Sequence, residues 1–301
     1  RFLKFILIIF GYIIILSISL DYIYTKIHMK KNNQRSKISK IQSLNFPKKL
    51  DYVILGSSRA LNHINPKMIY DSTKITGYNL GYAACGPFEI KLLFNEIIKN
   101  CNVDNFYIQV DYSFNHKEPN NLAVIGWLPY IKNREIYNEF AKHGFKYKLY
   151  RYIPFYRYMK NDPKIGFREI VLILFDKKNI FDINYGFYNN NSNTLKTLSE
   201  EKTSDLFLNE TINTLIKKGK LNNKKIYFFT APITKSHEIK NLENFLPNYT
   251  NFSDSIIENK YFSDERHLNI LGAEKFTNIF INHYINEISE DKLFHEKKSK
   301  P

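Results

Sequence analysis

The stretch DYVILGSS, residues 51–58, decides the fold class of this 301-residue chain. Its short apolar run is typical of a strand buried on both faces, as in a parallel sheet. Gly56 permits a tight turn at the end of that strand, where open α/β sheets bind their ligands. Ser58 then stands at the start of a helix, whose amide groups can stabilise an oxyanion. A plain Ser-Ser helix cap is the structural alternative.

The downstream sequence repeats strand and helix patterns. Strands are expected at 75–80, 105–110 and 225–230, and helices after Asn65-Pro66, after Gly86-Pro87, near 205–218 and before the C-terminus. Apolar side chains fall at helical spacing in the second and last of these helices. Alternating strands and helices indicate right-handed βαβ units. We therefore predict an α/β fold, a three-layer sandwich around a central parallel sheet.

An apolar segment opens the chain. Phe5–Leu20 lacks charge, follows Arg1 and Lys4, and with its neighbours reaches the length that spans a bilayer. A cleavable signal peptide is the alternative, but no A-x-A-like site follows. We expect a transmembrane anchor over residues 1–25 and a basic tether over residues 26–48.

The formal net charge of +15 is concentrated near this anchor. Residues 1–50 hold ten Lys or Arg against one acid, Asp21. Basic residues beside an apolar segment suit anionic lipid headgroups, and no zinc-finger spacing or RNA-binding aromatic signature is present. We expect contact with membrane lipid headgroups and no nucleic acid. The two cysteines, Cys85 and Cys101, are expected to be reduced core thiols.

Residues 113–200 break the α/β pattern and are expected to form a helical insertion in a domain that spans 49–290. A polar tail, 291–301, follows. Within the insertion, FKYKLYRYIPFYRYMK (145–160) alternates aromatic and basic residues. Three interpretations remain open for it: stacking on sugar rings, contact with a membrane surface, and a packed cap with solvated charges.

A second candidate site precedes the last helix. In Asp264-Glu265-Arg266-His267, an Asp three residues before a His can reach its Nδ1 and fix the tautomer. Nε2 then faces a hydroxyl nucleophile as a base. The alternative is a charged loop in which Asp264 caps the helix. No histidine pair has the spacing of a metal site such as H-E-x-x-H, so no metal is predicted.

Taken together, these stretches resemble the SGNH (GDSL-type) hydrolase superfamily. DYVILGSSRALNHINP is similar to its first block, YNLGYAACGPFE to its second, and SDERHLNILGAEKF to its last. The resemblance covers about residues 50–112 and 225–289. The Gly-Ser-Ser-Arg version and the anchor look most like membrane-anchored proteins of cell-envelope polysaccharide and teichoic acid acylation. The family implies a flavodoxin-like sheet order.

By position, the resemblance implies Ser58 as nucleophile, His267 as general base and Asp264 as its orienting partner. The oxyanion donors would be the Ser58 N–H and one N–H from the 81–86 loop. There, Ala84 stands where the family has Gly, flanked by Gly81 and Gly86.

The third block departs from the family, because Asp111 stands near the place of its Asn and an anionic carboxylate donates no hydrogen bond. Asn115 is an alternative donor, or the hole has two donors. Arg59 either pairs with an anionic substrate group or forms a salt bridge with an acid such as Asp111 or Glu89.

The function implied is an acyltransferase or esterase acting on O-acyl groups, above all O-acetyl, of an envelope polysaccharide, with no metal or organic cofactor. A membrane-bound O-acyltransferase is the implied partner. Two alternatives stay open: a catalytically inactive glycan-binding or scaffold subunit, and a general carbohydrate or lipid esterase. The family places the globular domain outside the cytoplasm, although the positive-inside rule favours the reverse.

Overall fold

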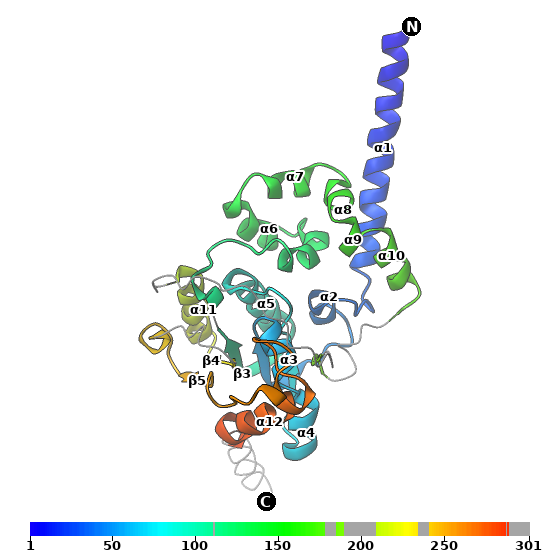
Figure 1. Cartoon of the computed structure of the whole chain (residues 1–301). Coiled ribbons are helices and arrows are strands. Elements are labelled where there is room, and N and C mark those ends of the chain that lie inside the picture. The colour runs from blue at the N-terminus through cyan, green and yellow to red at the C-terminus, as the bar shows by residue number, and fades with distance from the viewer. Residues whose placement is uncertain (111, 178–184, 190–208, 234–240, 287, 289–301) are drawn as a thin grey trace, which may run out of the picture. The chain divides into compact units, whose positions relative to one another are not determined.

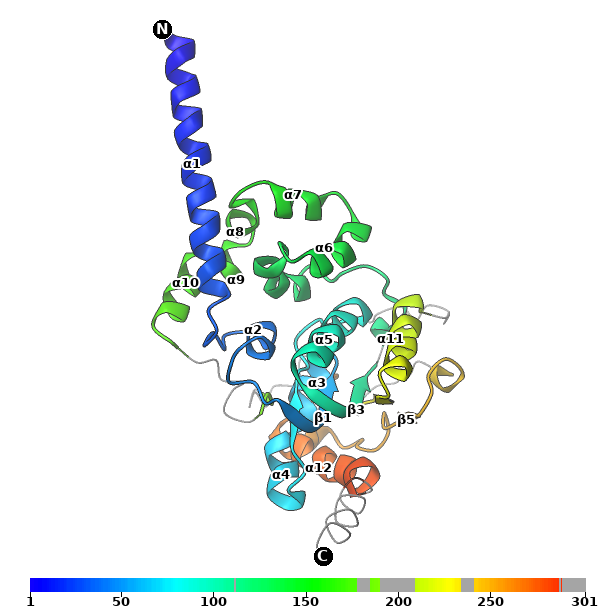
Figure 2. The ribbon, with the colours of Figure 1, turned by 180° about the vertical axis from the view of Figure 1, so that it is seen from behind.

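The computed structural model describes residues 1–110, 112–177, 185–189, 209–233, 241–286 and 288. The chain divides into two compact units. Residues 1–46 and 118–179 form one, here called the anchor unit, and residues 47–117 and 180–301 form the other, the sheet unit. Figures 1 and 2 show the elements of both.

The sheet unit is built on five parallel strands in the order β2-β1-β3-β4-β5. The strands are β1 (Lys49–Leu55), β2 (Gly77–Asn79), β3 (Asn102–Gln109), β4 (Lys225–Thr230) and β5 (Tyr249–Asn251). The chain passes from β1 to β2 on one side and then returns to place β3 on the other. The carboxyl ends of β1 and β3 therefore flank a topological switch point, the usual ligand position in such sheets.

Helices cover both faces of this sheet, which confirms the predicted α/β fold with three layers. The helices of the unit are α3 (Ser58–His63), α4 (Pro66–Thr73), α5 (Pro87–Asn100), α11 (Glu210–Leu221) and α12 (Ile270–Phe280), with shorter turns η1 (Tyr112–Asn115), η5 (Leu242–Asn244), η6 (Asn259–Tyr261) and η7 (Ile281–Ile285). Helices α5 and α11 lie on one face, and α3, α4 and α12 lie on the other (Figures 1 and 2).

Alternating strand side chains supply the two cores. Tyr52 and Ile54 of β1 are fully buried and pack in one cluster with Phe276 and Phe280 of α12. On the opposite face, the Phe106 ring lies 4.7 Å from the Phe94 ring of α5, centroid to centroid. Two buried faces explain why the strands read as nearly continuous apolar runs.

The anchor unit is helical in its described part. It contains α1 (Phe2–His28), α2 (Lys37–Ile41), η2 (Ala123–Tyr130), α6 (Arg134–Phe140), η3 (Ala141–His143), α7 (Lys146–Tyr152), α8 (Tyr156–Lys160), α9 (Asp162–Ile165) and α10 (Phe167–Leu174). Helix α1 is long and apolar enough to cross a membrane, and its apolar window is not buried by the protein.

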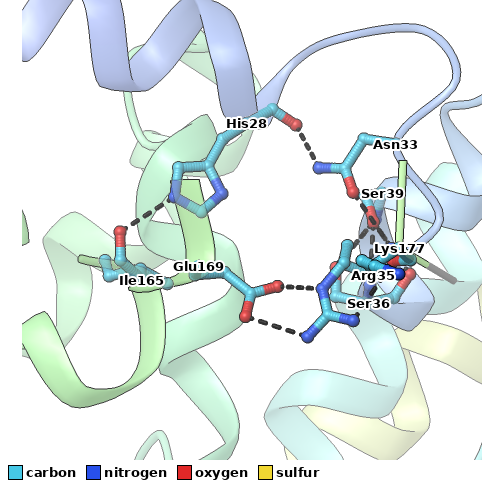
Figure 3. A network of polar contacts seen from close by, with 8 residues as sticks. All are labelled: His28, Asn33, Arg35, Ser36, Ser39, Ile165, Glu169 and Lys177. Carbon is cyan, nitrogen blue, oxygen red and sulfur yellow. Dashed lines mark hydrogen bonds and ion pairs between the residues drawn. The ribbon is translucent and has the colours of Figure 1, made fainter. Parts of the chain in front are cut away.

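The predicted tether is wrong, because residues 26–48 are folded. Helix α1 continues to His28, and all five residues of α2 are buried. Figure 3 shows the contacts that order this segment: Arg35 forms a two-pronged ion pair with Glu169 at 2.7 and 3.1 Å, and the His28 ring contacts the Ile165 carbonyl at 2.9 Å. Such long-range contacts leave no local periodicity in the sequence.

The boundaries of the insertion also differ from the prediction. Residues 118–177 fold with the N-terminal segment, whereas 185–189 belong to the sheet unit, where the Tyr185 carbonyl accepts a hydrogen bond from Asn79 N. Residues 113–117 of the predicted insertion also belong to the sheet unit, whereas 178–184, 190–200 and the tail at 291–301 lie outside the described residues. Cys85 and Cys101 are buried thiols, as expected.

Candidate active site

The turn after β1 positions Ser58. Gly56 has a φ of +148°, and a Cβ at this position would lie 2.7 Å from the Cβ of Gln109. Both the backbone conformation and this close approach require glycine. Ser57 caps the following helix by accepting a hydrogen bond from Arg59 N, and its own hydroxyl donates to Gln109 Oε1 at 2.7 Å. Ser58 is thereby placed as the first residue of α3.

Ser58, His267 and Asp264 come together in the structure. Ser58 Oγ lies 2.7 Å from His267 Nε2, and His267 Nδ1 lies 2.9 and 2.8 Å from the two Asp264 oxygens. A carboxylate accepts from Nδ1–H, so Nε2 is the acceptor for the Ser58 hydroxyl proton. The two motifs that lie far apart in the sequence are therefore in contact through their side chains. The His267 and Asp264 side chains keep 23% exposure, so the site is open to solvent.

Asp264 is held in its charged form. Burial by itself raises the pKa of this carboxyl, but the hydrogen bond and charge of His267 and two backbone amides lower it overall below its ordinary value. The amides are those of Arg266 and His267, whose N–H groups donate to Asp264 Oδ1 at 2.8 and 2.9 Å. Asp264 is therefore an anion that fixes the ring of His267 at neutral pH.

His63 holds the same loop in place, although no sequence pattern singles this residue out. The side chain is fully buried, and Nε2 accepts a hydrogen bond at 3.0 Å from the amide of Leu268, the residue after His267. Its ring lies 6.3 Å from that of His267, edge to face. Burial, with the charges of His267 and Arg59, holds the pKa of His63 well below its usual value. His63 is thus a neutral acceptor.

Two of the four residues named for the oxyanion hole use their amides elsewhere. Gly81 N donates to Asn79 Oδ1 at 3.0 Å, and Gly86 N donates to Glu89 Oε2 at 2.9 Å. Within the described residues, the N–H groups of Ser58 and Ala84 donate no hydrogen bond. The amides of Gly81 and Gly86 are therefore already used in local hydrogen bonds, and the donor roles of Ser58 and Ala84 stay predictions.

Ala84 adopts a left-handed backbone conformation, which is more typical of glycine. Its φ is +60°, in the left-handed region that glycine occupies with less strain. The loop is tied to the Ser58 turn, because Tyr82 N donates to the Gly56 carbonyl at 3.1 Å. The backbone N–H at this position is present whether the residue is alanine or glycine.

The three residues considered for substrate binding, Arg59, Asn115 and Asp111, differ in their surroundings. Arg59 is 3% exposed, and its Nη1 lies 3.5 Å from the Ala231 carbonyl, so it packs inside the sheet unit. Asn115 ends the η1 turn and is half-buried. Asp111 lies outside the described residues. A substrate-binding role for any of them stays a prediction.

Two further residues hold the site and were missed from the sequence. Gln109 ends β3, is 2% exposed and accepts from both the N–H and the hydroxyl of Ser57. Asn79 ends β2, and its amide donates to the carbonyls of Ala60 and Ile64 at 2.7 and 2.9 Å. Their position in the sequence could have identified them, because each is a polar residue at the carboxyl end of a predicted strand, where ligand sites of parallel sheets lie.

No known protein family model matches this chain, and neither does any curated protein. Among solved structures it is similar to a candidate acylhydrolase from Bacteroides fragilis, with 12% sequence identity and a TM-score of 0.35, over 88% of this chain and 95% of that one. At this level the two chains share too little for the neighbour to say what this chain does. Among the described residues, no group of three His, Cys, Asp or Glu could hold a metal ion.

Proposed function

We propose that this chain is a membrane-anchored, serine-dependent O-acyltransferase or esterase of the SGNH type. The observation that supports it most is the 2.7 Å contact between Ser58 Oγ and His267 Nε2, with Asp264 on the other ring nitrogen. This is the arrangement by which a histidine turns a serine hydroxyl into a nucleophile.

In this mechanism, Ser58 Oγ attacks the carbonyl carbon of an acyl ester and passes its proton to His267 Nε2. The N–H groups of Ser58 and Ala84 donate to the resulting oxyanion. The intermediate collapses to an acyl-serine, and the leaving alkoxide takes the proton from His267. An acceptor hydroxyl then gives its proton to His267 Nε2 and attacks the acyl-serine, and Ser58 Oγ takes that proton back as it leaves.

The substrate class rests on the resemblance described above. We propose an envelope polysaccharide as substrate, acetyl as the transferred group and a membrane-bound O-acyltransferase as partner. A sugar hydroxyl as the second acceptor gives transfer, and water gives hydrolysis. The exposure of His267 and Asp264 is compatible with both acceptors.

A chromogenic acetyl ester tests the proposal. The full chain in detergent should turn it over, and Ser58→Ala should lower the rate by at least about 10³-fold, because the nucleophile is gone. Ser72→Ala is the matched control: this serine is exposed on α4, and the variant should keep the rate of the unsubstituted protein. Incorporation of labelled acetyl into polysaccharide, compared with free acetate released, separates transfer from hydrolysis.

Equal rates for the Ser58→Ala variant and the unsubstituted protein would exclude serine catalysis. A folded chain that binds polysaccharide without turnover would instead be the inactive glycan-binding or scaffold subunit.

A further inference from the structure

We propose that the surface of α7 and α8 in the anchor unit lies against the anionic face of the bilayer that α1 crosses. This α7–α8 surface consists of the exposed side chains Phe145, Lys146, Lys148, Tyr152, Ile153, Met159 and Lys160. The inference rests on the proposed membrane anchoring of α1 and goes beyond it by assigning a lipid-binding surface to the helical insertion.

The first observation is a buried ion pair between α1 and α8. Asp21 is 1% exposed, Arg157 is fully buried, and Arg157 Nη1 lies 2.7 Å from Asp21 Oδ1. Phe155 N donates to the same oxygen at 3.0 Å, and Lys132 also contacts the Asp21 carboxylate. Removal of one partner from a buried pair leaves an uncompensated charge, so α8 is fixed to α1 at this point.

A second set of contacts lies one turn further along α1. The Arg157 Nη2 group donates to Thr25 Oγ1 at 2.7 Å, and the Tyr158 hydroxyl lies 2.9 Å from the same atom. The Tyr24 ring packs edge-on against that of Phe155, with 4.9 Å between centroids. One side of the C-terminal part of α1 thus contacts α8, although Tyr22 and Ile23 stay exposed, whereas its N-terminal part is exposed on all sides.

The point along α1 where contacts with α8 begin indicates where the bilayer ends. Apart from Lys4, residues 2–20 carry no charge and are largely exposed, and at 1.5 Å per residue they span about 28 Å, close to the hydrocarbon thickness of a membrane. Asp21 follows directly, so the buried ion pair falls at the level of the headgroups. Helix α8 lies beside α1 there, and α7 lies on the side of the anchor unit toward which α1 projects (Figures 1 and 2).

The side chains of the α7–α8 surface suit that level of the membrane. Phe145, Tyr152 and Met159 are 68%, 67% and 65% exposed, although the unit has a core that buries Trp127, Phe140 and Tyr147. Residues 141–168 carry eight Lys or Arg against a single acid, Asp162. Exposed aromatic and apolar side chains between lysines are typical of segments that lie in the headgroup region of anionic membranes.

Fluorescence quenching by lipid tests this proposal in the full chain. Single cysteines at Tyr152→Cys and Met159→Cys are labelled with an environment-sensitive dye in nanodiscs that contain anionic lipid and a lipid with a nitroxide headgroup. The native thiols give little background, because both are buried and the pKa of Cys101 is raised to about 11. Ile13→Cys, read with a nitroxide on the lipid acyl chain, is the reference within the membrane, and the dye coupled to glutathione is the reference in solvent.

We expect quenching at positions 152 and 159 to be several-fold above the solvent reference and stronger on anionic than on zwitterionic lipid. The triple variant Lys146→Gln, Lys148→Gln, Lys160→Gln should lose most of that difference. Solvent-level quenching at both positions would overturn the proposal, as would quenching that is independent of lipid charge. Protection of the dye by soluble polysaccharide in place of lipid would assign the surface to glycan and also overturn it.

Position 13 separates this failure from that of the anchor. Quenching at 13 without quenching at 152 and 159 leaves the anchor in place and removes the lipid-binding surface. Solvent-level quenching at position 13 would show that α1 does not enter the bilayer, in which case the proposed anchoring and this inference both fail.

Discussion

His267 depends on two neighbours that do not touch Ser58. Asp264 binds its ring through Nδ1, and His63 binds the amide of the next residue, Leu268. The first contact sets the tautomer and the second sets the position of the loop. Substitutions at these two residues should therefore produce different kinetic and pH effects.

Replacement of Asp264→Asn should lower kcat for the chromogenic ester by about 10⁴-fold, as an amide in this place favours the wrong tautomer of the histidine. KM should change little, because Asp264 makes no contact with the acyl group in the proposed mechanism. Steady-state kinetics measure both values. A loss of less than tenfold would mean that His267 does not act as the base.

Replacement of His63→Leu removes the acceptor of the Leu268 N–H and leaves a buried donor unpaired, which costs about 1–3 kcal/mol of stability. We expect kcat to fall about tenfold at unchanged KM, since the loop that holds His267 loosens. His63→Gln supplies an amide oxygen as acceptor and should restore part of kcat. Equal activity of the Leu variant and the unsubstituted protein would contradict a positioning role.

The same variant has a pH signature. The pKa of His63 is depressed in the folded chain, so below its unfolded value of about 6.5 the unfolded state binds a proton that the folded state does not. The contribution of His63 to the free energy of unfolding is therefore fully present above pH 6.5. It falls below that pH by up to about 1.4 kcal/mol per pH unit. Denaturant unfolding at pH 7.5 and pH 5.5 should show the deficit of His63→Leu shrinking at the lower pH.

The elements around the site are short and are joined by loops with special backbone conformations. Ala84→Gly should raise the free energy of unfolding by about 0.5–1 kcal/mol. A left-handed alanine costs about 1–2 kcal/mol, and the greater entropy of glycine in the unfolded chain offsets part of the gain. Turnover should stay within about twofold, since the proposed donor is the backbone N–H. Thermal unfolding and ester kinetics check this, and a tenfold loss of turnover would argue against Ala84 as a donor position.

The elements of the sheet unit were predictable where apolar runs and capping residues mark them. The strand at 225–230 and the helix that Asn65 caps agree with the structure. Strand β5 was missed, because its three residues, Tyr249–Asn251, are polar and lie at the sheet edge. Ser58, Asp264 and His267 were accessible from motif order, whereas Gln109 and His63 act through contacts between residues far apart in the sequence.

Helix α2 and the ion pair of Arg35 with Glu169 illustrate the same limit in the anchor unit. Arg35 and Glu169 lie 134 residues apart, and a pattern of neighbouring residues cannot report such a contact.

The loop at residues 81–86 in the sheet unit is a further case. Three residues looked equivalent as donors, and only the hydrogen bonds of Gly81 and Gly86 show that their amides are already used.

At the scale of the whole molecule, we propose that the sheet unit lies outside the cytoplasm, as envelope polysaccharide acylation requires. Alkaline phosphatase fused after residue 50 should then be active, and a fluorescent protein that matures only in the cytoplasm should stay dark there. The basic residues after α1 favour the opposite orientation, so the experiment is a strong test. The reverse pattern would remove both the location and the polysaccharide substrate.

The order of the site residues along the chain also bears on biosynthesis. Ser58 is made early and His267 late, and the helix after His267 completes the core beneath β1 and β3. A chain that stops before this helix therefore presents a serine without its base, in a sheet whose α3–α4 face lacks α12. In the proposed mechanism, reactivity toward esters is therefore acquired only after His267 and the helix that follows it have been made.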